Sequence, residues 1–362
     1  MLMTSVNLPL TPPSSTKKSV RNDDTTKVAP KRLISQLKRS VRKPRLKYRP
    51  TEYSVFSLDD YVDGHKGSKC REEDAEFLRY TLRYSKKMIG VVGAGISVAA
   101  GIPDFRSSDG LFNSMKSETL SSGKESFDFN KVYASDERSN IFHDMIVNLH
   151  QLSNKSEPTS FHKMLDKLAG EDRLMRLYTQ NIDGLDTRLT HLTTKTPLQK
   201  PIPRTIQLHG SVEYMECNMC SKLEKFNPVI FQSEEEIVPS CPQCKEFEEV
   251  RSIAGLRPKG IGKLRPRVVL YNEVHPEGEM IGDIATNDLK KRIDCLIIAG
   301  TSLKIPGVIQ MCKRFIEKIQ VTNGIVIYMN KDMPSQSLLN TLGHIDLIVL
   351  GDCQNVPKLV DC

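Results

Sequence analysis

The sequence predicts an α/β fold, with a doubly wound parallel sheet and a smaller inserted module. Between residues 70 and 355, short and almost entirely apolar runs alternate with longer amphipathic ones. Small or polar residues follow these runs, at the points where buried strands would end. Between about residues 211 and 262, a charged stretch with two Cys-x-x-Cys pairs interrupts the alternation. Apolar strands that alternate with helices are typical of a parallel sheet covered on both faces, and the interruption is typical of an insertion.

The individual elements follow from these patterns in chain order. Near-continuous apolar runs suit strands buried on both faces, and they predict strands at 88–95, 174–179, 267–271, 294–300, 324–330 and 345–351. Amphipathic spacing predicts helices at 71–86, 139–152, 158–169 and 308–319. Five of the strands run into "GAGIS", "TQNID", "GTSL", "MNKD" and "GDCQ". Because ligands of open α/β sheets bind outside the carboxyl ends of the strands, these clusters predict a site for one extended ligand.

Residues 1–50 differ in composition from the rest of the chain. They contain 13 Lys or Arg and two Asp, a net charge of +11, whereas the whole chain of 362 residues carries +8. Their many Pro, Ser, Thr and cationic residues predict a basic disordered tail. A nuclear-import signal and an arm that makes weak contacts with nucleic acid are both compatible with such a tail. Thr11, which precedes Pro12, is a candidate phosphorylation site within a degradation signal.

The remaining chain has the composition of a soluble intracellular protein. The sequence is 38% hydrophobic, which is enough for a sizeable core. Its longest apolar runs fall short of the roughly 20 residues that span a bilayer, and the N-terminus shows no apolar segment of the secretory type. We therefore expect no membrane contact.

Four of the nine cysteines form the strongest metal signal in the chain. Cys217 and Cys220 make one Cys-x-x-Cys pair, and Cys241 and Cys244 make a second pair after 20 intervening residues. Two such pairs wrap one tetrahedral Zn²⁺, and four thiolate ligands leave no open position for a catalytic water. The spacing therefore predicts one structural zinc in the inserted module, and we expect the other cysteines to be free thiols.

The stretch "VVGAGISVAAGIPDFRSSDG", residues 91–110, has two interpretations. Gly93 and Gly95 allow a tight turn in which the backbone approaches a pyrophosphate at a helix N-terminus. Close packing of a helix against a strand is the alternative reason for glycine here, and Gly101 lies six residues beyond Gly95 instead of the three of the dinucleotide fingerprint. The triplet that follows is either a packed ion pair or part of a ligand site, and it consists of Asp104, Phe105 and Arg106.

Polar side chains in "TQNID" and at the end of "TIQLHG" are further candidates for chemistry. Unpaired buried amides and carboxylates cost about 1 to 3 kcal/mol each, so Gln180, Asn181 and Asp183 are expected to bind one another or an amide-bearing ligand. Capping of the next helix is the alternative for Asp183. His209 lies between the sheet and the inserted module, and histidine suits proton transfer near neutral pH. The alternative for His209 is a packed structural histidine.

Taken together, these segments resemble the sirtuins, the NAD-dependent protein deacylases related to silent information regulator two. The resemblance rests on "GAGISVAAGIPDFR", "TQNIDGLD", "LHG", the two Cys-x-x-Cys pairs, "RPRVVLYNE", "GTSL", "MN" and "GDC", which occur in this order. The segments "GLRPKGIGKLRPRVVLYNEVHPEG" and "KRIDCLIIAGTSLKIPGV" are most similar to the fungal nuclear histone deacetylases of that family. The resemblance implies a catalytic domain at 51–362, with a Rossmann-like NAD-binding core at 70–210 and 263–355 and a zinc-binding module at 211–262.

The resemblance also implies NAD as co-substrate and assigns residues to it. His209 would act as general base, with Asn181 as the second catalytic residue, and Phe105 would cover the reacting bond and exclude water. The products would be nicotinamide, O-acetyl-ADP-ribose and deacetylated lysine. The implied NAD contacts are Gly93, Ala94, Gly95, Ile96, Asp104, Phe105, Arg106, Gln180, Asn181, Ile182, Asp183, Gly300, Thr301, Ser302, Asn330, Lys331 and Cys353.

The implied substrate is an acetylated lysine of a histone tail or histone core. By family analogy, its peptide pairs in a strand-like manner with Val269, Leu270 and Tyr271. Many relatives have Phe-Gly-Glu where this chain has Tyr-Asn-Glu at 271–273. Because Asn tolerates positive φ, we expect the turn to persist and the peptide preference to differ. The stretch "SSDGLF" at 107–112 is also shorter than usual for the cofactor loop of the family.

Three functional hypotheses follow. The first is a nuclear NAD-dependent histone lysine deacetylase that acts on chromatin, in silencing and genome stability. The second keeps the NAD chemistry in a mono-ADP-ribosyltransferase or in a deacylase for longer acyl groups. The third is a zinc-containing chromatin-binding module without catalysis, which would leave His209 and Asn181 without a task.

Overall fold

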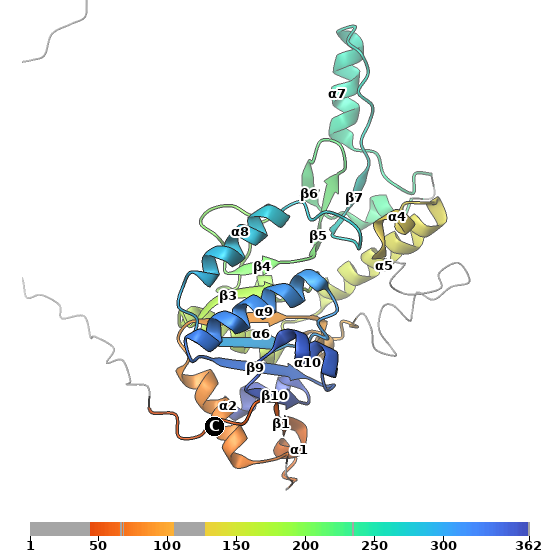
Figure 1. The fold of residues 1–362 in the computed structure, drawn as a ribbon. Coiled ribbons are helices and arrows are strands. Elements are labelled where there is room, and N and C mark those ends of the chain that lie inside the picture. Colours follow the sequence, from red (N-terminus) through yellow and green to blue (C-terminus); the bar gives the residue numbers. More distant parts are fainter. Residues whose placement is uncertain (1–43, 66, 68, 105–126, 234, 361–362) are drawn as a thin grey trace, which may run out of the picture. The chain divides into compact units, whose positions relative to one another are not determined.

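The structure is a computed structural model that describes residues 44–65, 67, 69–104, 127–233 and 235–360 (Figure 1). The chain divides after Pro44 into two units, and the fold below is that of the unit that begins at Arg45. Over the described ranges, none of the helices combines the length and the apolar character that crossing a bilayer would need.

A seven-stranded parallel sheet forms the centre of this unit. Its strands lie in the order β1-β10-β9-β8-β2-β3-β4. From β2 the chain adds β3 and β4 on one side, whereas β8, β9 and β10 extend the sheet on the other, so the direction of winding reverses between β2 and β8. Ligands of such sheets bind at this switch point. The strands are β1 (Ser54–Ser57), β2 (Met88–Val92), β3 (Leu174–Thr179), β4 (Thr205–Gln207), β8 (Cys295–Ala299), β9 (Ile325–Asn330) and β10 (Leu347–Leu350).

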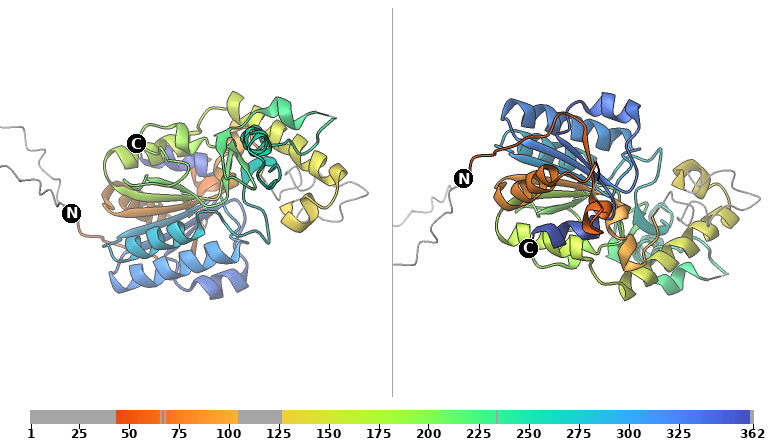
Figure 2. Two further views of the ribbon diagram at one scale, coloured as in Figure 1. Left: turned by 90° about the horizontal axis from the view of Figure 1, so that it is seen from above. Right: turned by 90° about the horizontal axis from the view of Figure 1, so that it is seen from below.

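Helices cover both faces of the sheet, as the two views in Figure 2 show. Alternate residues of each strand point to opposite faces, so Met88 and Val92 enter one core and Ile89 and Val91 enter the other. The first face carries α1 (Leu58–Val62), α2 (Glu72–Tyr84), α6 (Ser160–Gly170) and α11 (Val356–Val360). The second face carries α8 (Gly278–Leu289), α9 (Pro306–Val321) and α10 (Gln336–Leu342). The predicted doubly wound fold is therefore confirmed.

A second, antiparallel sheet has the strand order β6-β5-β7. It consists of β5 (Gly210–Cys217), β6 (Leu223–Lys225) and β7 (Leu264–Val268), and α7 (Pro242–Ile253) projects from it (Figure 1). Its core also includes apolar residues of α5 (Asp136–Lys155), which follows α4 (Phe129–Val132). The small sheet is thus covered by a helix that precedes it by more than fifty residues in the chain, because α5 ends at Lys155 and β5 begins at Gly210.

The strand predicted at 267–271 is wrong in direction and in extent. The observed β7 pairs antiparallel with β5, and Cys217 lies opposite Leu264. Side chains along β7 alternate between buried and partly exposed, which is typical of an antiparallel strand with one solvated face. The apolar run continues beyond β7 because Val269 and Leu270 line a cavity. The prediction also omitted β1 and β4, which are only four and three residues long.

Candidate functional site

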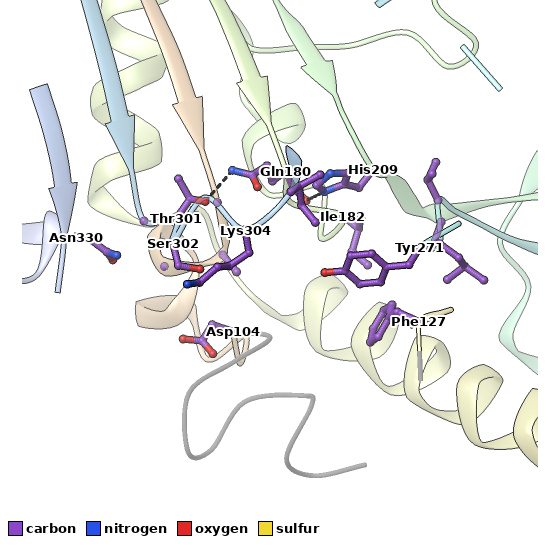
Figure 3. Close-up of a pocket in the computed structure, with 18 of the residues that line it drawn as sticks. Asp104, Phe127, Gln180, Ile182, His209, Tyr271, Thr301, Ser302, Lys304 and Asn330 are labelled. Atoms are coloured by element: carbon purple, nitrogen blue, oxygen red, sulfur yellow. Dashed lines mark hydrogen bonds between the residues drawn. The ribbon is translucent and has the colours of Figure 1, made fainter. Parts of the chain in front are cut away.

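A cavity of about 480 Å³ lies where the carboxyl ends of the parallel strands meet the small sheet (Figure 3). Asn330 lies at one end of the view, Phe127 and Tyr271 lie at the other, and Gln180 and His209 lie between them. This volume is typical of sites that bury a small organic ligand. The lining residues are Gly93, Ala94, Gly95, Asp104, Phe127, Gln180, Ile182, His209, Val268, Val269, Leu270, Tyr271, Asn272, Glu273, Gly300, Thr301, Ser302, Lys304, Ile305, Asn330 and Asp332.

The turns after β2 and β8 pack against each other at the floor of the cavity. Gly95 N donates to Gly300 O over 2.9 Å. A Cβ atom on Gly95 would lie 2.8 Å from Gly300 Cα, and one on Gly300 would lie 2.6 Å from Ile96 N. Gly300 also has a φ of 61°, in the left-handed region that favours glycine. The glycines therefore allow two turns to pack closely, which differs from the helix–strand packing that was the alternative interpretation, and the same turns form part of the cavity lining.

Hydroxyl and amide groups line the cavity beside these turns. Gln180 Nε2 donates to Thr301 Oγ1 over 2.8 Å, the dashed contact between these side chains in Figure 3. Ser302 and Lys304 lie next to Thr301 in the same view, and Asn330 comes from the end of β9. The cavity thus has donors and acceptors along its length, supplied by the ends of three different strands.

His209 lies between β4 and β5, where the two sheets join. Its Nδ1 lies 3.1 Å from Gln180 O, and because a carbonyl only accepts, Nδ1 carries the proton and Nε2 carries the lone pair. Desolvation lowers the pKa of His209 to about 4, so the imidazole is neutral at pH 7. A neutral ring with a free lone pair, beside a cavity, is able to accept a proton.

Asn181 and Asp183 are buried behind the lining of the cavity. Asn181 Nδ2 donates to Ser97 Oγ over 3.2 Å, whereas its Oδ1 is buried with no hydrogen-bond partner in the described part of the chain. Asp183 Oδ1 accepts from Leu185 N over 2.9 Å, and burial raises the pKa of the Asp183 carboxyl. The Leu185 contact is a local turn and does not cap the following 3-10 helix (Asp186–Arg188), whose N-cap is Leu185, and the Asn181 oxygen is the orphaned acceptor of the pair.

Three other predicted NAD contacts also lie outside the cavity lining. Ile96 is fully buried, Cys353 is buried with its Sγ 3.9 Å from Gly95 O, and Lys331 is exposed. Phe105 and Arg106, and the short loop 107–112, fall outside the described residues. The remaining predicted NAD contacts and all three predicted peptide contacts line the cavity.

The prediction missed several residues that line the cavity. Phe127 reaches it from the segment before α4, and Ile305 and Asp332 reach it from the loops after β8 and β9. Lys304 follows "GTSL" directly, so this motif could have indicated its position. Phe127 lies in a segment with no such motif, and its position depends on tertiary packing.

The four cysteines of the inserted module converge on one point. Their sulfur atoms all lie within 4.8 Å of one another, and the Cys217–Cys244 and Cys220–Cys241 pairs each measure 3.7 Å. A tetrahedral zinc with Zn–S bonds of about 2.3 Å requires sulfur separations of about 3.8 Å. The residues present therefore fit one structural zinc with four protein ligands and no position for water.

The sequence of the chain is similar to that of a known family. The Sir2 family model matches residues 93–307. The chain is 54% identical to the NAD-dependent histone deacetylase HST4 of Saccharomyces cerevisiae, over 98% of this chain and 98% of that protein. It is 52% identical to the NAD-dependent protein deacetylase hst4 of Schizosaccharomyces pombe, over 75% of this chain and 65% of that protein.

Solved structures show the same fold. A Sir2 homolog in complex with NAD superposes with a TM-score of 0.58 at 23% identity, covering 79% of this chain and 92% of that chain. Sir2Tm bound to a propionylated peptide gives a TM-score of 0.56 at 22% identity, covering 79% and 95%. At these identities the likeness concerns the arrangement of the strands and helices.

Proposed function

The chain belongs to the Sir2 family and is an NAD-dependent protein deacetylase, and we propose that it acts on histone lysines in the nucleus. One observation carries this proposal, namely that the cavity joins the two glycine turns of the parallel sheet to His209 and to the wall at 269–271. A single site can therefore hold a nucleotide and an acylated peptide side by side. The similarity to a histone deacetylase over 98% of the chain supports the substrate class.

The residues on the nucleotide side fit NAD. Gly95 and Gly300 line the cavity, and the orphaned Oδ1 of Asn181 is an acceptor directly behind that lining. We assign Thr301, Ser302 and Asn330 to ribose and phosphate groups, since hydroxyls and amides donate to such oxygens. When bound, NAD would supply the ribose carbon that the acetyl oxygen attacks as nicotinamide leaves, and the ribose hydroxyl on which the acetyl group ends. The predicted contacts at Phe105, Arg106, Lys331 and Cys353 remain proposals.

His209 is the general base in this proposal. Its Nδ1–H is held by Gln180 O, which orients Nε2 and keeps the lone pair on that atom. The pKa of about 4 keeps the ring neutral across the physiological range, so no proton has to leave before it accepts one. Asn181 positions the neighbouring polar groups through its contact with Ser97.

The peptide side of the cavity is more apolar. Val268 and Leu270 are buried, and Ile182 and Phe127 lie beside them in the lining. Such a wall suits the methylene chain of an acylated lysine, whose uncharged amide costs less to desolvate than a free ammonium group. We propose that the peptide backbone pairs with residues 269–271, in the manner of an added strand.

The proposal has three further parts that concern the rest of the chain. Residues 1–50 form a basic tail that carries a nuclear address and contacts nucleic acid weakly, and residues 51–362 form the catalytic domain. The zinc is structural, and it holds the small sheet against which the peptide wall is built. The role of the enzyme lies in chromatin silencing and genome stability.

The test is the deacetylation of acetylated histone peptides, followed by mass spectrometry with and without NAD. We expect NAD-dependent loss of the acetyl group by the wild-type protein and a loss of rate of about 10² to 10⁴-fold in His209→Ala, since that is the usual contribution of one proton-transfer residue. His191→Ala, at an exposed histidine outside the cavity, is the matched control and should retain its rate. Near-normal activity of His209→Ala would remove this residue from the mechanism.

A further inference from the structure

The peptide wall is attached to the start of α4 by backbone hydrogen bonds. Tyr271 N donates to Phe127 O over 2.7 Å, and Phe129 N donates to Tyr271 O over 3.0 Å. These two bonds make a parallel bridge between Asp128 and Tyr271. Phe127 and Tyr271 face the cavity together (Figure 3). The position of α4 therefore determines where this part of the wall lies.

A side-chain hydrogen bond joins the same two segments at the tip of the turn. Asn272 Nδ2 donates to Asp128 Oδ2 over 2.6 Å, while Asp128 Oδ1 accepts from Asn130 N over 2.9 Å and caps α4. One carboxylate thus serves the helix with one oxygen and the turn with the other. Hydrogen bonds that involve a charged group are stronger than those between neutral groups.

The backbone at Asn272 is adapted to this contact. Its φ is 63°, in the left-handed region that Asn tolerates better than most other residues with a side chain. Glycine would adopt the same φ without strain but would have no side chain to reach Asp128. The residue at 272 therefore combines the turn conformation with an attachment to α4.

The next residue fixes the turn through contacts with the segment that precedes it. Glu273 Oε2 accepts from Leu270 N over 3.0 Å, and Glu273 forms an ion pair with Arg265. The Arg265 guanidinium lies 5.6 Å from the centre of the Phe129 ring. Tyr271 is thus held between the Glu273 contacts on one side and the Asn272–Asp128 contact on the other.

We propose that Asn272 and Asp128 form a clasp that holds the peptide wall in its binding position, which makes both of them positioning residues for the acylated peptide. This inference rests on the proposed function, because it takes the peptide as the ligand of the wall. Without the clasp, the segment around Tyr271 samples more positions, and peptide binding has to restore the order. The glycine turns lie on other loops, and the hydrogen bond from Val269 N to His209 O, 3.0 Å long, involves neither residue of the clasp.

Two single variants each remove the Asn272–Asp128 hydrogen bond and keep the neighbouring interactions. Asn272→Gly keeps the φ and removes the amide, and Asp128→Ser keeps a good helix cap on a side chain too short to reach residue 272. In each, the KM for an acetylated peptide should rise about three- to tenfold, while kcat and the KM for NAD stay within about twofold, because the lost contact orders only the peptide wall. The double variant should be no worse than either single variant.

An exchange of the two partners provides the rescue. Asp128→Asn combined with Asn272→Asp lets the new amide cap α4 with its oxygen and donate to the new carboxylate, so the peptide KM should return to within about twofold of wild type. Asn272→Asp alone sets two carboxylates against each other and should bind peptide worst. An unchanged KM in Asn272→Gly, or a double exchange as poor as Asn272→Asp, would overturn the clasp.

Hydrogen–deuterium exchange tests the clasp without any substrate. The amides of Phe129 and Tyr271 should exchange faster in Asn272→Gly than in the wild-type protein, since their shared bridge opens more often. Equal exchange rates would contradict the clasp even in a protein that lacks activity. A wild-type protein that does not deacetylate peptides would instead contradict the proposed function.

Discussion

The parallel sheet and the small antiparallel sheet are stabilised by different kinds of interaction. Every residue of β2 and of β8 is buried, and the helices on the two faces add large apolar side chains. In the small sheet, β6 has no buried residue, and Cys244 is the buried residue of α7. Phe247, Val250 and Ile253 of that helix are largely exposed. Apolar burial organises the first region and the packing of the small sheet on α5, whereas the cysteine cluster and ion pairs organise the part around β6 and α7.

Because the two regions are stabilised differently, we expect loss of the metal to unfold the small sheet before the parallel sheet. Structural zinc sites contribute about 10 to 16 kcal/mol of binding free energy, which the few apolar contacts around α7 do not replace. Chelation, or Cys241→Ser, should expose the segment from 210 to 268 to limited proteolysis and abolish deacetylation, because this segment supports the peptide wall. Fragments are identified by mass spectrometry.

Cys70→Ser is the matched control for the cysteine variant. Cys70 lies outside the cluster, partly exposed, at the start of α2. This variant should keep the protease resistance and the activity of the wild-type protein. Equal resistance of the chelated and zinc-loaded proteins would show that the small sheet does not depend on metal.

The parallel region also contains a buried ion pair, whose contribution to stability can be compared with that of an exposed pair in the small sheet. Asp288 of α8 accepts from Arg176 Nε over 2.7 Å and from Tyr178 Oη over 2.9 Å. Burial would raise the pKa of Asp288, but the hydrogen bonds from Arg176 and Lys291 lower it. Asp288→Ala leaves a buried guanidinium unpaired and should destabilise the fold by about 3 to 5 kcal/mol in urea unfolding.

The corresponding test in the small region is the pair between Lys263 and Glu236. It measures 2.8 Å, but both side chains are exposed to solvent by two fifths or more, so solvent screens it. Glu236→Ala should change the unfolding free energy by less than about 1 kcal/mol. If it cost as much as Asp288→Ala, stabilisation by charge in the small sheet would be stronger than this account allows.

A further effect is expected from acid pH, through one buried histidine in each region. Burial lowers the pKa of His162 in α6 and of His143 in α5 to about 4. In the unfolded chain their pKa is about 6.5, so below that value the unfolded state binds more protons and stability falls. Each histidine should cost on the order of 1.4 kcal/mol per pH unit between about pH 6.5 and 4, and neither should matter above pH 7.

His162→Gln isolates this effect in the parallel region. His162 Nδ1 accepts from Thr159 N over 3.2 Å in a capping box, and glutamine keeps the box without titrating. Urea unfolding at pH 7.5 and pH 5 should show a smaller acid loss for this variant than for the wild-type protein. Identical pH dependence would mean that the pKa of His162 is the same in the folded and unfolded states.

The same comparison explains how much of the fold could be predicted from the sequence. The buried strands β3, β8, β9 and β10 are predicted because uninterrupted apolar runs have few other uses. The prediction for β7 was wrong because the apolar residues that follow this strand line a cavity. A run of apolar residues in the sequence does not distinguish strand residues from cavity-lining residues. The packing of α5 on the small sheet was missed, since an amphipathic pattern identifies a buried face but not its partner.

The residues of the site also fall into two groups, those that the sequence predicted and those that it did not. The polar clusters at the ends of β2, β3, β8 and β9 were visible in the sequence, because parallel topology brings strand ends together. Phe127 was not predicted, since its place depends on the bridge between Asp128 and Tyr271. The clasp at Asn272 depends on the same bridge, which pairs segments 143 residues apart. Contacts of this kind follow from tertiary packing and leave no local pattern.

The stoichiometry of the reaction tests whether this cavity carries out NAD-dependent deacetylation. The wild-type protein is incubated with NAD, labelled in its adenosine part, and with an acetylated histone peptide, and the products are separated and counted. One nicotinamide and one labelled O-acetyl-ADP-ribose are expected for each acetyl group removed, with no label on protein. Label transferred to protein, or acetyl loss that continues without NAD, would contradict the assignment of this cavity to NAD-dependent deacetylation.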